Sequence, residues 1–434
     1  MKTDSDKLDF KAILPIFVIV LVDLLGLTII IPLLPLYATA FGASPLMIGL
    51  LGSVYPVMQF VAAPVLGSLS DRYGRKPVLL ISQIGTFLGF LLLGVANGLP
   101  LLFISRLVDG ISGGNISTAQ AVISDSTNEK TRTPAMGMIG AAFGLGFTVG
   151  PIIAFTSLAA SGNNYALPAY IAAACSLVSI LLTTFWLKES LPPEKRNLTK
   201  SLARPSFSNM LGALKLPGIG FLLLLMFAQQ GVFFSFEQLL PLFTLNRMGM
   251  NASGNAAIFV FVGIITVIVQ GGLVRIWSKK FGDRWLILLG VSAMAIGLFL
   301  TALTPAQALP SYSRSAIQAE LKTSDTAKNK VVLPDESNKG WFGLGWLMVA
   351  MIPAAVGGAV LSPTINSAIS KRASPGEIGR MLGLSAAFSS AANAITPTVG
   401  GAIYQYLGMS APFLIGTVIL VFFYVQARKK TDYA

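Results

Sequence analysis

Four ionisable residues lie inside long apolar segments of the sequence: Asp23, Arg106, Asp109 and Glu237. A charge at the centre of a bilayer costs roughly 2.5 to 3.5 kcal/mol on insertion scales, so a residue of this kind indicates a functional site. Arg106 and Asp109 are three positions apart, which on a helix places them on one face, where they can pair. Asp23 and Glu237 carry carboxyl groups that, in surroundings of low polarity, can hold and release a proton.

These residue types suit the exchange of a proton for a substrate between two access states. Asp23 and Glu237 are predicted to be the proton carriers, and Arg106 would stabilise an ionised partner or bind an anionic group of the substrate. Two alternatives stay open. Arg106 and Asp109 could form an internal bridge with no part in transport, and Glu237, in the outer part of its segment, could be solvated.

The composition indicates a polytopic membrane protein. Hydrophobic residues make up 54% of the chain and charged residues 11%, against about 25% charged residues in soluble domains. At about 20 apolar residues per span, the 434 residues allow on the order of twelve helices. There is no histidine, the one cysteine is Cys175, and no GxxxxGK[ST] loop is present. We therefore expect no enzymatic activity, no metal site, no disulfide framework and no cofactor. With Asp23 and Glu237 as proton carriers, the proton gradient is the expected driving force.

The apolar segments predict an all-α membrane protein with 12 transmembrane helices in two bundles. The N-terminal six-helix bundle (1–187) has predicted spans at 12–36, 45–66, 78–96, 100–122, 134–155 and 165–187. A stretch rich in proline and lysine, 188–215, is predicted to be a cytoplasmic linker. The C-terminal six-helix bundle (216–434) has predicted spans at 218–240, 255–276, 285–303, 341–361, 376–403 and 411–426, with a long outer loop at 304–340.

The basic residues predict the orientation. Of the 31 lysines and arginines, Arg106 is in a span, Arg247 is in an outer turn and five are in the 304–340 loop. All the others fall on one side of the twelve-helix arrangement. By the positive-inside rule that side is the cytoplasm, and both termini lie there. The net charge of +13 is then an orientation signal and an attraction to anionic lipid, and we expect no nucleic-acid partner.

The chain also contains an internal repeat. Residues 72–80 (RYGRKPVLL) align with 280–288 (KFGDRWLIL), and residues 135–154 align with 381–400. The two segments of the first alignment are 208 positions apart and those of the second are 246 apart, and the difference of 38 is about the length of the 304–340 loop, as an insertion there would require. Two duplicated halves with a site between them at mid-membrane are typical of secondary transporters.

Several segments resemble motifs of one family. Residues 67–77 (GSLSDRYGRKP) resemble the loop motif between helices two and three of the major facilitator superfamily nearly position for position. Residues 105–114 (SRLVDGISGG) are similar to its helix-four motif, and residues 146–151 (GFTVGP) to the helix-five motif of its proton-coupled antiporters. Residues 23–26 (DLLG) resemble helix one of its drug/proton antiporters with twelve spans.

Within that family two groups are the most similar. Residues 105–153 resemble tetracycline/proton antiporters and tetracycline-transporter-like organic-anion carriers. Residues 234–237 (FSFE) resemble the acidic segment of a quinolone and multidrug efflux pump. The resemblance covers almost the whole chain and implies a transporter with two six-helix bundles.

The resemblance also implies a cytoplasmic gate. Asp71 would lie against the N-terminal end of helix eleven, near Gly376, and Arg75 would pair with Asp125. The expected gate residues are Gly67, Asp71, Gly74, Arg75 and Asp125. In the second half, Lys279 and Asp283 stand where the counterparts of Asp71 and Arg75 would be, so that turn would be connected differently.

Helix five is expected to pack closely on a neighbour. Small residues recur every fourth position along it, and Pro151 would bend it. The resemblance implies that this face, with Gly146, Gly150 and Pro151 of the antiporter motif, lies against helix one or eight and prevents leak. Ala154 replaces a glycine at the end of the motif, and plain helix packing is the alternative.

The predicted substrate contacts are amides and one aromatic side chain. They are Gln59, Asn115, Gln229, Gln230 and Phe233. A largely apolar cavity with few acids suits amphiphilic or aromatic molecules better than sugars.

The function that these patterns favour is proton-coupled export of drugs or tetracycline-like molecules by a monomer in the cell membrane. Its expected partners are the small-molecule substrate, protons and lipids. One alternative is an importer, symporter or uniporter, of a small organic anion or metabolite. Another is a lipid flippase, and a non-transporting receptor would be a third.

Overall fold

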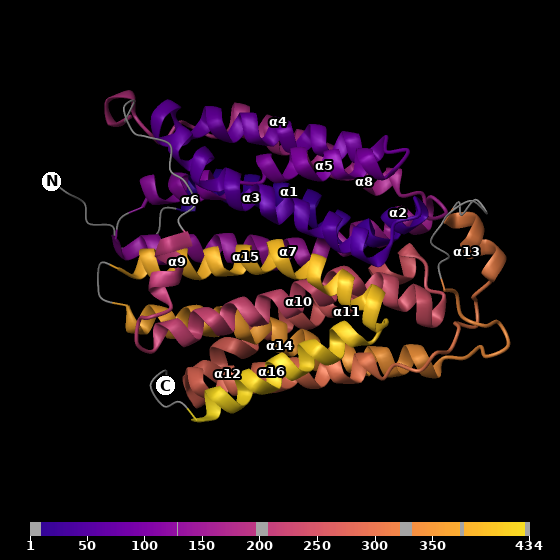
Figure 1. Ribbon diagram of the computed structural model, residues 1–434. Helices are drawn as coiled ribbons and strands as arrows, with labels where there is room; N and C mark the ends of the chain where they lie inside the picture. Colours follow the sequence, from indigo (N-terminus) through magenta and orange to yellow (C-terminus); the bar gives the residue numbers. More distant parts are fainter. Residues whose placement is uncertain (1–9, 128, 197–206, 322–331, 374–376, 430–434) are drawn as a thin grey trace. The chain divides into compact units, whose positions relative to one another are not determined.

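The computed structural model of the chain describes residues 10–127, 129–196, 207–321, 332–373 and 377–429 (Figure 1). These residues form sixteen α-helices, one 3₁₀ helix and one π-helical segment; the only strand-like pairing among them is a single bridge between Ala308 and Lys339. They divide into two compact units, residues 1–30 with 57–205 and residues 31–56 with 206–434. The boundaries of the bundles at 187 and 216 stay a prediction.

The first unit packs around α1 and α4. It contains α1 (Phe10–Ile30), the second part of α3 (Pro45–Tyr73), α4 (Arg75–Gly94), α5 (Leu99–Ser112), α6 (Asn115–Asp125), α7 (Glu129–Ala160), α8 (Ala166–Phe185) and the 3₁₀ helix η1 (Pro193–Lys195). Helix α1 lies against α7 and α8, and α4 lies against α5 and α8. Apolar side chains of α1, α6 and α7 form one buried cluster in this unit.

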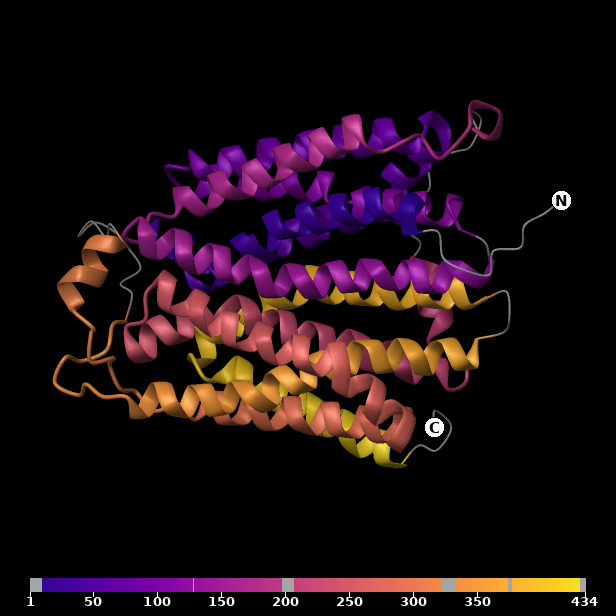
Figure 2. The same ribbon diagram turned by 180° about the vertical axis from the view of Figure 1, so that it is seen from behind.

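The second unit packs around α10, α12 and α14. It contains α2 (Leu34–Ala40), the first part of α3, α9 (Phe207–Ala213), α10 (Ile219–Met248), α11 (Ala252–Ile268), the π-helical η2 (Val269–Leu273), α12 (Val274–Ala302), α13 (Arg314–Glu320), α14 (Phe342–Arg372), α15 (Ile378–Leu407) and α16 (Ala411–Lys429). Helix α12 lies against α14 and α16, and α10 lies against α15 and α14. Figure 2 shows the loop with α13 at the opposite end of this unit from the end of α16.

Within the described residues, most of each predicted apolar segment falls on helix, but two predicted helices are broken. Segment 12–36 divides into α1 and α2, because Pro32 follows the end of α1 and Pro35 occupies the first turn of α2; a proline inside a helix removes a backbone hydrogen bond. Segment 100–122 divides into α5 and α6 at Gly113 and Gly114. The prediction of two continuous helices was wrong at these places.

Eight helices among the described residues are long and apolar enough to cross a membrane. One of them is the helical run Ala252–Ala302, which includes two predicted spans, 255–276 and 285–303. Its backbone leaves helical geometry at Gly282. The count of twelve spans and the cytoplasmic side of the termini stay predictions.

The two turns related by the sequence repeat have the same backbone form. Gly74 has φ 108° and ψ 156°, and Gly282 has φ 78° and ψ 169°. A side chain with a Cβ is strained at positive φ, so glycine is required at both positions. Each turn is followed at once by a charged residue, Arg75 in one case and Asp283 in the other.

Candidate functional site

Asp23 of α1 is held by one amide. Asn115 Nδ2 donates to Asp23 Oδ2 at 2.8 Å. The other carboxyl oxygen, Oδ1, is buried and has no hydrogen-bond partner among the described residues. The two predicted site residues therefore meet within the first unit, and one acceptor is left over for a proton or a ligand.

The break between α5 and α6 places Asn115 there. Asn115 is the first residue of α6, directly after Gly113 and Gly114. A Cβ at Gly114 would lie 2.9 Å from the backbone of Ala63 on α3, so only glycine allows this approach. Gln59 of α3 donates through Nε2 to the Gly113 carbonyl at 2.8 Å. Gln59 thus stabilises the break, and helix interruptions of this kind often occur at transporter sites.

Arg106 and Asp109 form an ion pair inside the first unit. Arg106 Nη1 lies 3.0 Å from Asp109 Oδ2, at an angle that makes no hydrogen bond, and both side chains are 2% exposed. The Arg106 guanidinium lies over the Phe90 ring, 5.6 Å from its centroid. Its Nε and Nη2 atoms are buried without hydrogen-bond partners in the described structure. Asp109 is also close enough to Asp23 to act on it electrostatically.

Glu237 of α10 is buried and has no partner among the residues that the structure describes. Its side chain is 6% exposed, and no hydrogen bond or ion pair joins it to another described residue. The low exposure of this side chain disfavours the alternative of a solvated carboxyl group. An unpaired carboxylate in such a place would be costly, which favours a bound proton.

Glu237 shares a face of α10 with two other predicted residues. Gln229, Phe233 and Glu237 recur every four residues, so they lie on one side of the helix. A Cβ at Gly358 of α14 would come within 2.7 Å of the Phe233 ring, which shows that this face is turned to α14. Gln229 is buried and its Oε1 has no partner among the described residues, whereas Gln230 is only partly buried.

Helix α7 packs closely on α1. Thr28 Oγ1 donates to the Gly146 carbonyl at 2.8 Å. A Cβ at Gly150 would come within 2.7 Å of Thr28 Cβ. Of the two neighbours expected for this face, helix one is therefore the one that these glycines meet. Pro151 is buried in the same helix.

In the second unit, the first part of α3 is in close contact with α15. A Cβ at Gly49 would lie 2.9 Å from the Pro397 carbonyl carbon, and a Cβ at Gly401 would lie 3.2 Å from Gly49 Cα. Thr398 Oγ1 and Ser53 Oγ are 2.9 Å apart in a hydrogen bond. Glycine on both helices lets the two backbones come together at this point.

Arg75 forms the centre of the predicted gate. Its Nε donates to Asp125 Oδ2 at 2.9 Å, and its Nη1 donates to Ser70 Oγ at 2.7 Å and to Asp71. Gly67 lies on the same helix as Asp71, and a Cβ added there would lie 3.7 Å from Ser117 Oγ on α6. The predicted Arg75–Asp125 pair is thus present in the structure. The expected partner of Asp71 near Gly376 lies outside the described residues.

Sequence reasoning missed the residue that caps α4. Glu189 follows α8, and its carboxylate accepts from the backbone N–H groups of Arg75 at 3.0 Å and Lys76 at 3.2 Å. A carboxylate at a helix N-terminus is stabilised by the unpaired N–H groups and by the helix dipole. Ser190 Oγ also donates to Asp125 at 3.2 Å. The acid directly after a predicted span was the available signal, but it did not indicate which helix end it would reach.

The corresponding turn in the second unit has the opposite charges. Asp283 Oδ2 accepts from Lys371 Nζ at 2.7 Å and from Ser367 Oγ at 3.1 Å, both on α14. Asp283 follows Gly282 as Arg75 follows Gly74, and Lys371 lies near the end of α14 as Asp125 does at the end of α6. Each unit therefore holds its turn by an ion pair, and the acid and the base have changed places.

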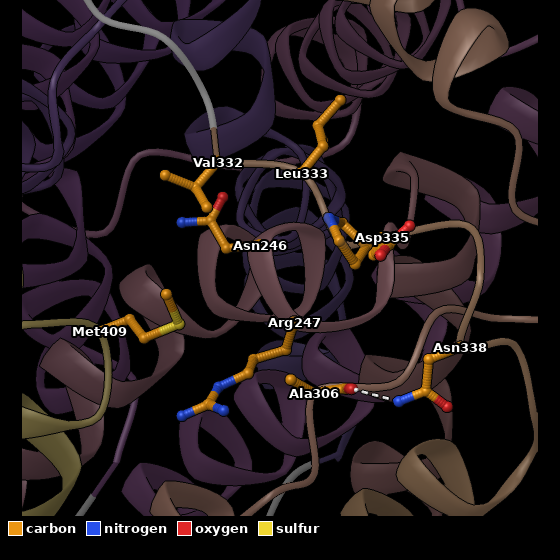
Figure 3. A pocket seen from close by; sticks show the side chains of 9 residues that line it. Asn246, Arg247, Ala306, Val332, Leu333, Asp335, Asn338 and Met409 are labelled. Atoms are coloured by element: carbon orange, nitrogen blue, oxygen red, sulfur yellow. Dashed lines mark hydrogen bonds between the residues drawn. The ribbon is translucent and has the colours of Figure 1, made fainter.

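A cavity of about 410 Å³ lies under the 304–340 loop in the second unit (Figure 3). Its lining includes Asn246 and Arg247 at the end of α10, Met409, and Asp335 and Asn338 of the loop. Hydrogen bonding from Ser337 lowers the pKa of Asp335, so its carboxylate is ionised at neutral pH. None of the predicted coupling residues lines this cavity. Within the described ranges no group of three or more Cys, Asp or Glu side chains could hold a metal ion.

The predicted residues are thus distributed over both units. Asp23, Asn115, Gln59, Arg106 and Asp109 lie in the first unit; Glu237, Gln229, Gln230 and Phe233 lie in the second. Each unit contains a carboxyl group, Asp23 or Glu237, with at least one oxygen that no described residue pairs.

Comparison with known proteins agrees with this architecture. A family model described as Major Facilitator Superfamily matches residues 16–317 and 340–430. The tetracycline resistance protein, class B, of Escherichia coli is 28% identical over 392 residues, which cover 90% of this chain and 87% of that protein. Major facilitator superfamily domain-containing protein 10 of Homo sapiens is 27% identical over 465 residues, covering 96% of this chain and 92% of that protein.

A solved structure shares the fold. The crystal structure of the human organic anion transporter MFSD10 (TETRAN) aligns with a TM-score of 0.62 at 23% identity, covering 96% of this chain and 99% of that one. The helical architecture agrees with the family model that matches most of the chain. The relatives and the solved structure belong to the same class of membrane transporter. The chain belongs to the major facilitator superfamily and is a multi-pass membrane transporter, not an enzyme.

Proposed function

We propose that this transporter exports small amphiphilic or aromatic compounds, such as drugs or tetracycline-like molecules, in exchange for protons. It would work by alternating access in the cell membrane, as a monomer with twelve spans and cytoplasmic termini, without a cofactor. The tetracycline resistance protein among its relatives supports the substrate class. The observation that carries the proposal is the burial of Glu237 without any partner among the described residues.

Protonation explains how such a group can exist inside a membrane protein. A neutral carboxylic acid is far less costly to bury than a carboxylate. Loss of the proton would leave a charge that the surroundings of Glu237 do not compensate, so deprotonation would favour a different conformation or an incoming cationic or polar substrate. A proton and a substrate that compete for one group are exchanged one for the other.

Asp23 would be the second carrier. Asn115 stabilises one oxygen of its carboxyl group and leaves the other buried and unpaired. The Arg106–Asp109 pair is near enough to influence it. A change of protonation at Asp23 would therefore change the electrostatic energy of the buried ion pair. The ion pair would in turn alter the packing of α5 on α4.

The gate residues would bias the access state. Arg75, Asp71 and Asp125 fix the Gly74 turn to the end of α6. Exposed ion pairs are each worth about 0 to 1 kcal/mol. Arg75 is mostly buried with several partners, so its network would hold the turn more firmly than a single exposed pair.

Reconstitution in proteoliposomes with an imposed pH gradient tests the proposal. Dyes and antibiotics are added to the wild type and to Asp23→Asn, and the internal pH is followed with an indicator. We expect the acidic compartment to become more alkaline when a substrate is added to the wild type, and no such change with the variant. Substrate movement with an unaltered pH trace in both proteins would exclude antiport.

A second candidate is an organic-anion carrier. Two buried donor atoms of Arg106 have no partner among the described residues, as binding of an anionic group would require. A relative of this chain is the protein solved as a human organic anion transporter. This candidate requires that anionic dyes be transported by the wild type without proton movement and not by Arg106→Gln. The 2% exposure of Arg106 favours the proton antiporter.

A further inference from the structure

Six basic residues gather where α12 turns at Gly282, and we name them the cationic turn: Arg275, Lys279, Lys280 and Arg284 of α12, with Arg428 and Lys429 of α16. All but Arg284, which is partly buried, are exposed. Arg284 Nη2 donates to the Arg428 carbonyl at 3.0 Å. This bond joins the end of α16 to the turn, where the two helices lie side by side (Figure 1).

Among the described residues, the positive charge of the cationic turn has little local counter-charge. Asp283 is the one acidic residue between positions 274 and 285. Its side chain is 8% exposed, points into the second unit and is engaged by Lys371. None of the six basic side chains forms an ion pair with another described residue. The charge is therefore available to an external anion.

Aromatic side chains alternate with these bases. Phe281 stacks on Trp285 with ring centroids 4.4 Å apart, and Trp277 meets Trp285 edge-on at 6.5 Å. Lys280 Nζ lies 5.2 Å from the centroid of Phe281. Phe281 is 43% exposed and Trp285 39%, and the neighbouring Ile276 is 59% exposed. Tryptophan rings of this kind are enriched at the level of lipid headgroups.

We propose that the cationic turn binds the headgroup of an anionic phospholipid, whose acyl chains lie on the exposed apolar side chains beside it. A small soluble anion or a nucleic acid would use the basic side chains and leave Ile276, Phe281 and Trp285 uncovered. A phospholipid with a net negative charge supplies both partners, since its phosphate pairs with lysine and arginine while its hydrocarbon covers the rings.

The bound lipid would act on a conformational element. Lys279 and Lys280 directly precede the turn at Gly282, and Asp283 of the same turn accepts a hydrogen bond from Lys371. An anion held on the outer surface of the turn offsets the repulsion among its bases. The turn, with its ion pair to α14, would then be more stable in an anionic bilayer than in a zwitterionic one.

The test is lipid titration of the full chain in neutral detergent. Brominated phosphatidylglycerol is added, and its binding is read from quenching of tryptophan fluorescence, with brominated phosphatidylcholine as the zwitterionic reference. We expect the wild type to bind phosphatidylglycerol at lower concentration than phosphatidylcholine. Lys279→Gln with Lys280→Gln should weaken the phosphatidylglycerol binding on the order of tenfold or more.

Matched variants separate this site from the overall charge. Lys188→Gln with Lys215→Gln removes the same charge from exposed positions elsewhere and should change the binding less than twofold. Trp277→Phe with Trp285→Phe should remove the quenching that is selective for phosphatidylglycerol. Equal weakening by both lysine pairs, selective quenching that survives loss of the two tryptophans, or full competition by inorganic phosphate alone would overturn the proposal.

Discussion

The buried ionisable residues of this transporter are of two kinds, those with a counter-charge and those without one. Arg106 and Asp109 compensate each other at 2% exposure, so either residue without the other would be a buried, unpaired ion. Glu237 has no counter-charge and no hydrogen bond among the described residues, and Asp23 has a single amide donor. The charges of Arg106 and Asp109 compensate each other, whereas in our proposal a bound proton or ligand compensates Glu237 and Asp23.

Two amide variants distinguish these two kinds. If Glu237 holds a proton as proposed, Glu237→Gln replaces a neutral acid by a neutral amide of the same shape, so the free energy of unfolding should change by less than about 1 kcal/mol while proton-coupled transport is lost. Asp109→Asn leaves Arg106 buried without its partner and should cost about 3 to 5 kcal/mol. Thermal unfolding in detergent, together with transport, measures both. A large loss of stability in Glu237→Gln would mean that this carboxyl group is structural.

At the residue scale the sequence predicted which ionisable side chains lie inside apolar helices better than it predicted their contacts. The four membrane-embedded ionisable residues were evident from their apolar surroundings, and the pairing of Arg75 with Asp125 was predicted from the family resemblance and is confirmed. The contact of Asn115 with Asp23 and the cap that Glu189 provides for α4 were not predicted. Both depend on how distant helices pack, and no local pattern encodes that.

At the scale of elements, helix breaks and glycine contacts position the site. The interruption at Gly113 and Gly114 turns Asn115 toward Asp23, and Gln59 satisfies the freed carbonyl. Apolar runs predicted where helices lie, but not these interruptions, because glycine is compatible with a helix interior and only the close approach of α3 makes the break favourable.

The contact between α3 and α15 should open during transport. Ser53→Cys with Thr398→Cys, in a Cys175→Ser background, places two thiols where the hydroxyl oxygens are 2.9 Å apart. We expect an oxidant to form a disulfide and to reduce transport at least tenfold, and a reductant to restore it. Helix α3 is divided between the two units, so a relative movement of the units in alternating access should separate its first part from α15. The single Ser53→Cys variant is the control. Full transport by the cross-linked protein would show that the contact is static.

The reversed ion pair of the second turn gives a charge-swap prediction. Asp283→Asn removes the negative charge that pairs with Lys371 and replaces one carboxylate oxygen by an NH2 donor, and should cost about 1 to 3 kcal/mol of unfolding free energy. Asp283→Lys combined with Lys371→Asp should recover more than half of the loss that Asp283→Lys causes alone. A double-mutant cycle on thermal unfolding measures this coupling. Additive effects in the cycle would show that the pair contributes nothing.

At the scale of the whole molecule, the duplication explains why the two units have similar parts with different chemistry. Gly74 and Gly282 make the same kind of turn, and each turn is followed by a charged residue paired to the end of another helix. The sequence repeat predicted the equivalence of the turns. It also placed an acid, Asp283, at the counterpart of Arg75 and predicted only that this turn would be connected differently; the ion pair with Lys371 came from the fold.

Proton release on substrate binding is the most direct test of the exchange at Asp23 and Glu237. Purified transporter in weakly buffered detergent solution is mixed with a substrate that the dye and antibiotic screen has identified. A pH indicator records the protons released as the substrate binds. We predict about one proton per substrate bound for the wild type, because substrate and proton compete for one carboxyl group, and a clear reduction in Glu237→Gln or Asp23→Asn at saturating substrate. Saturable binding to the wild type with no proton released at any pH from 5 to 9 would contradict the account.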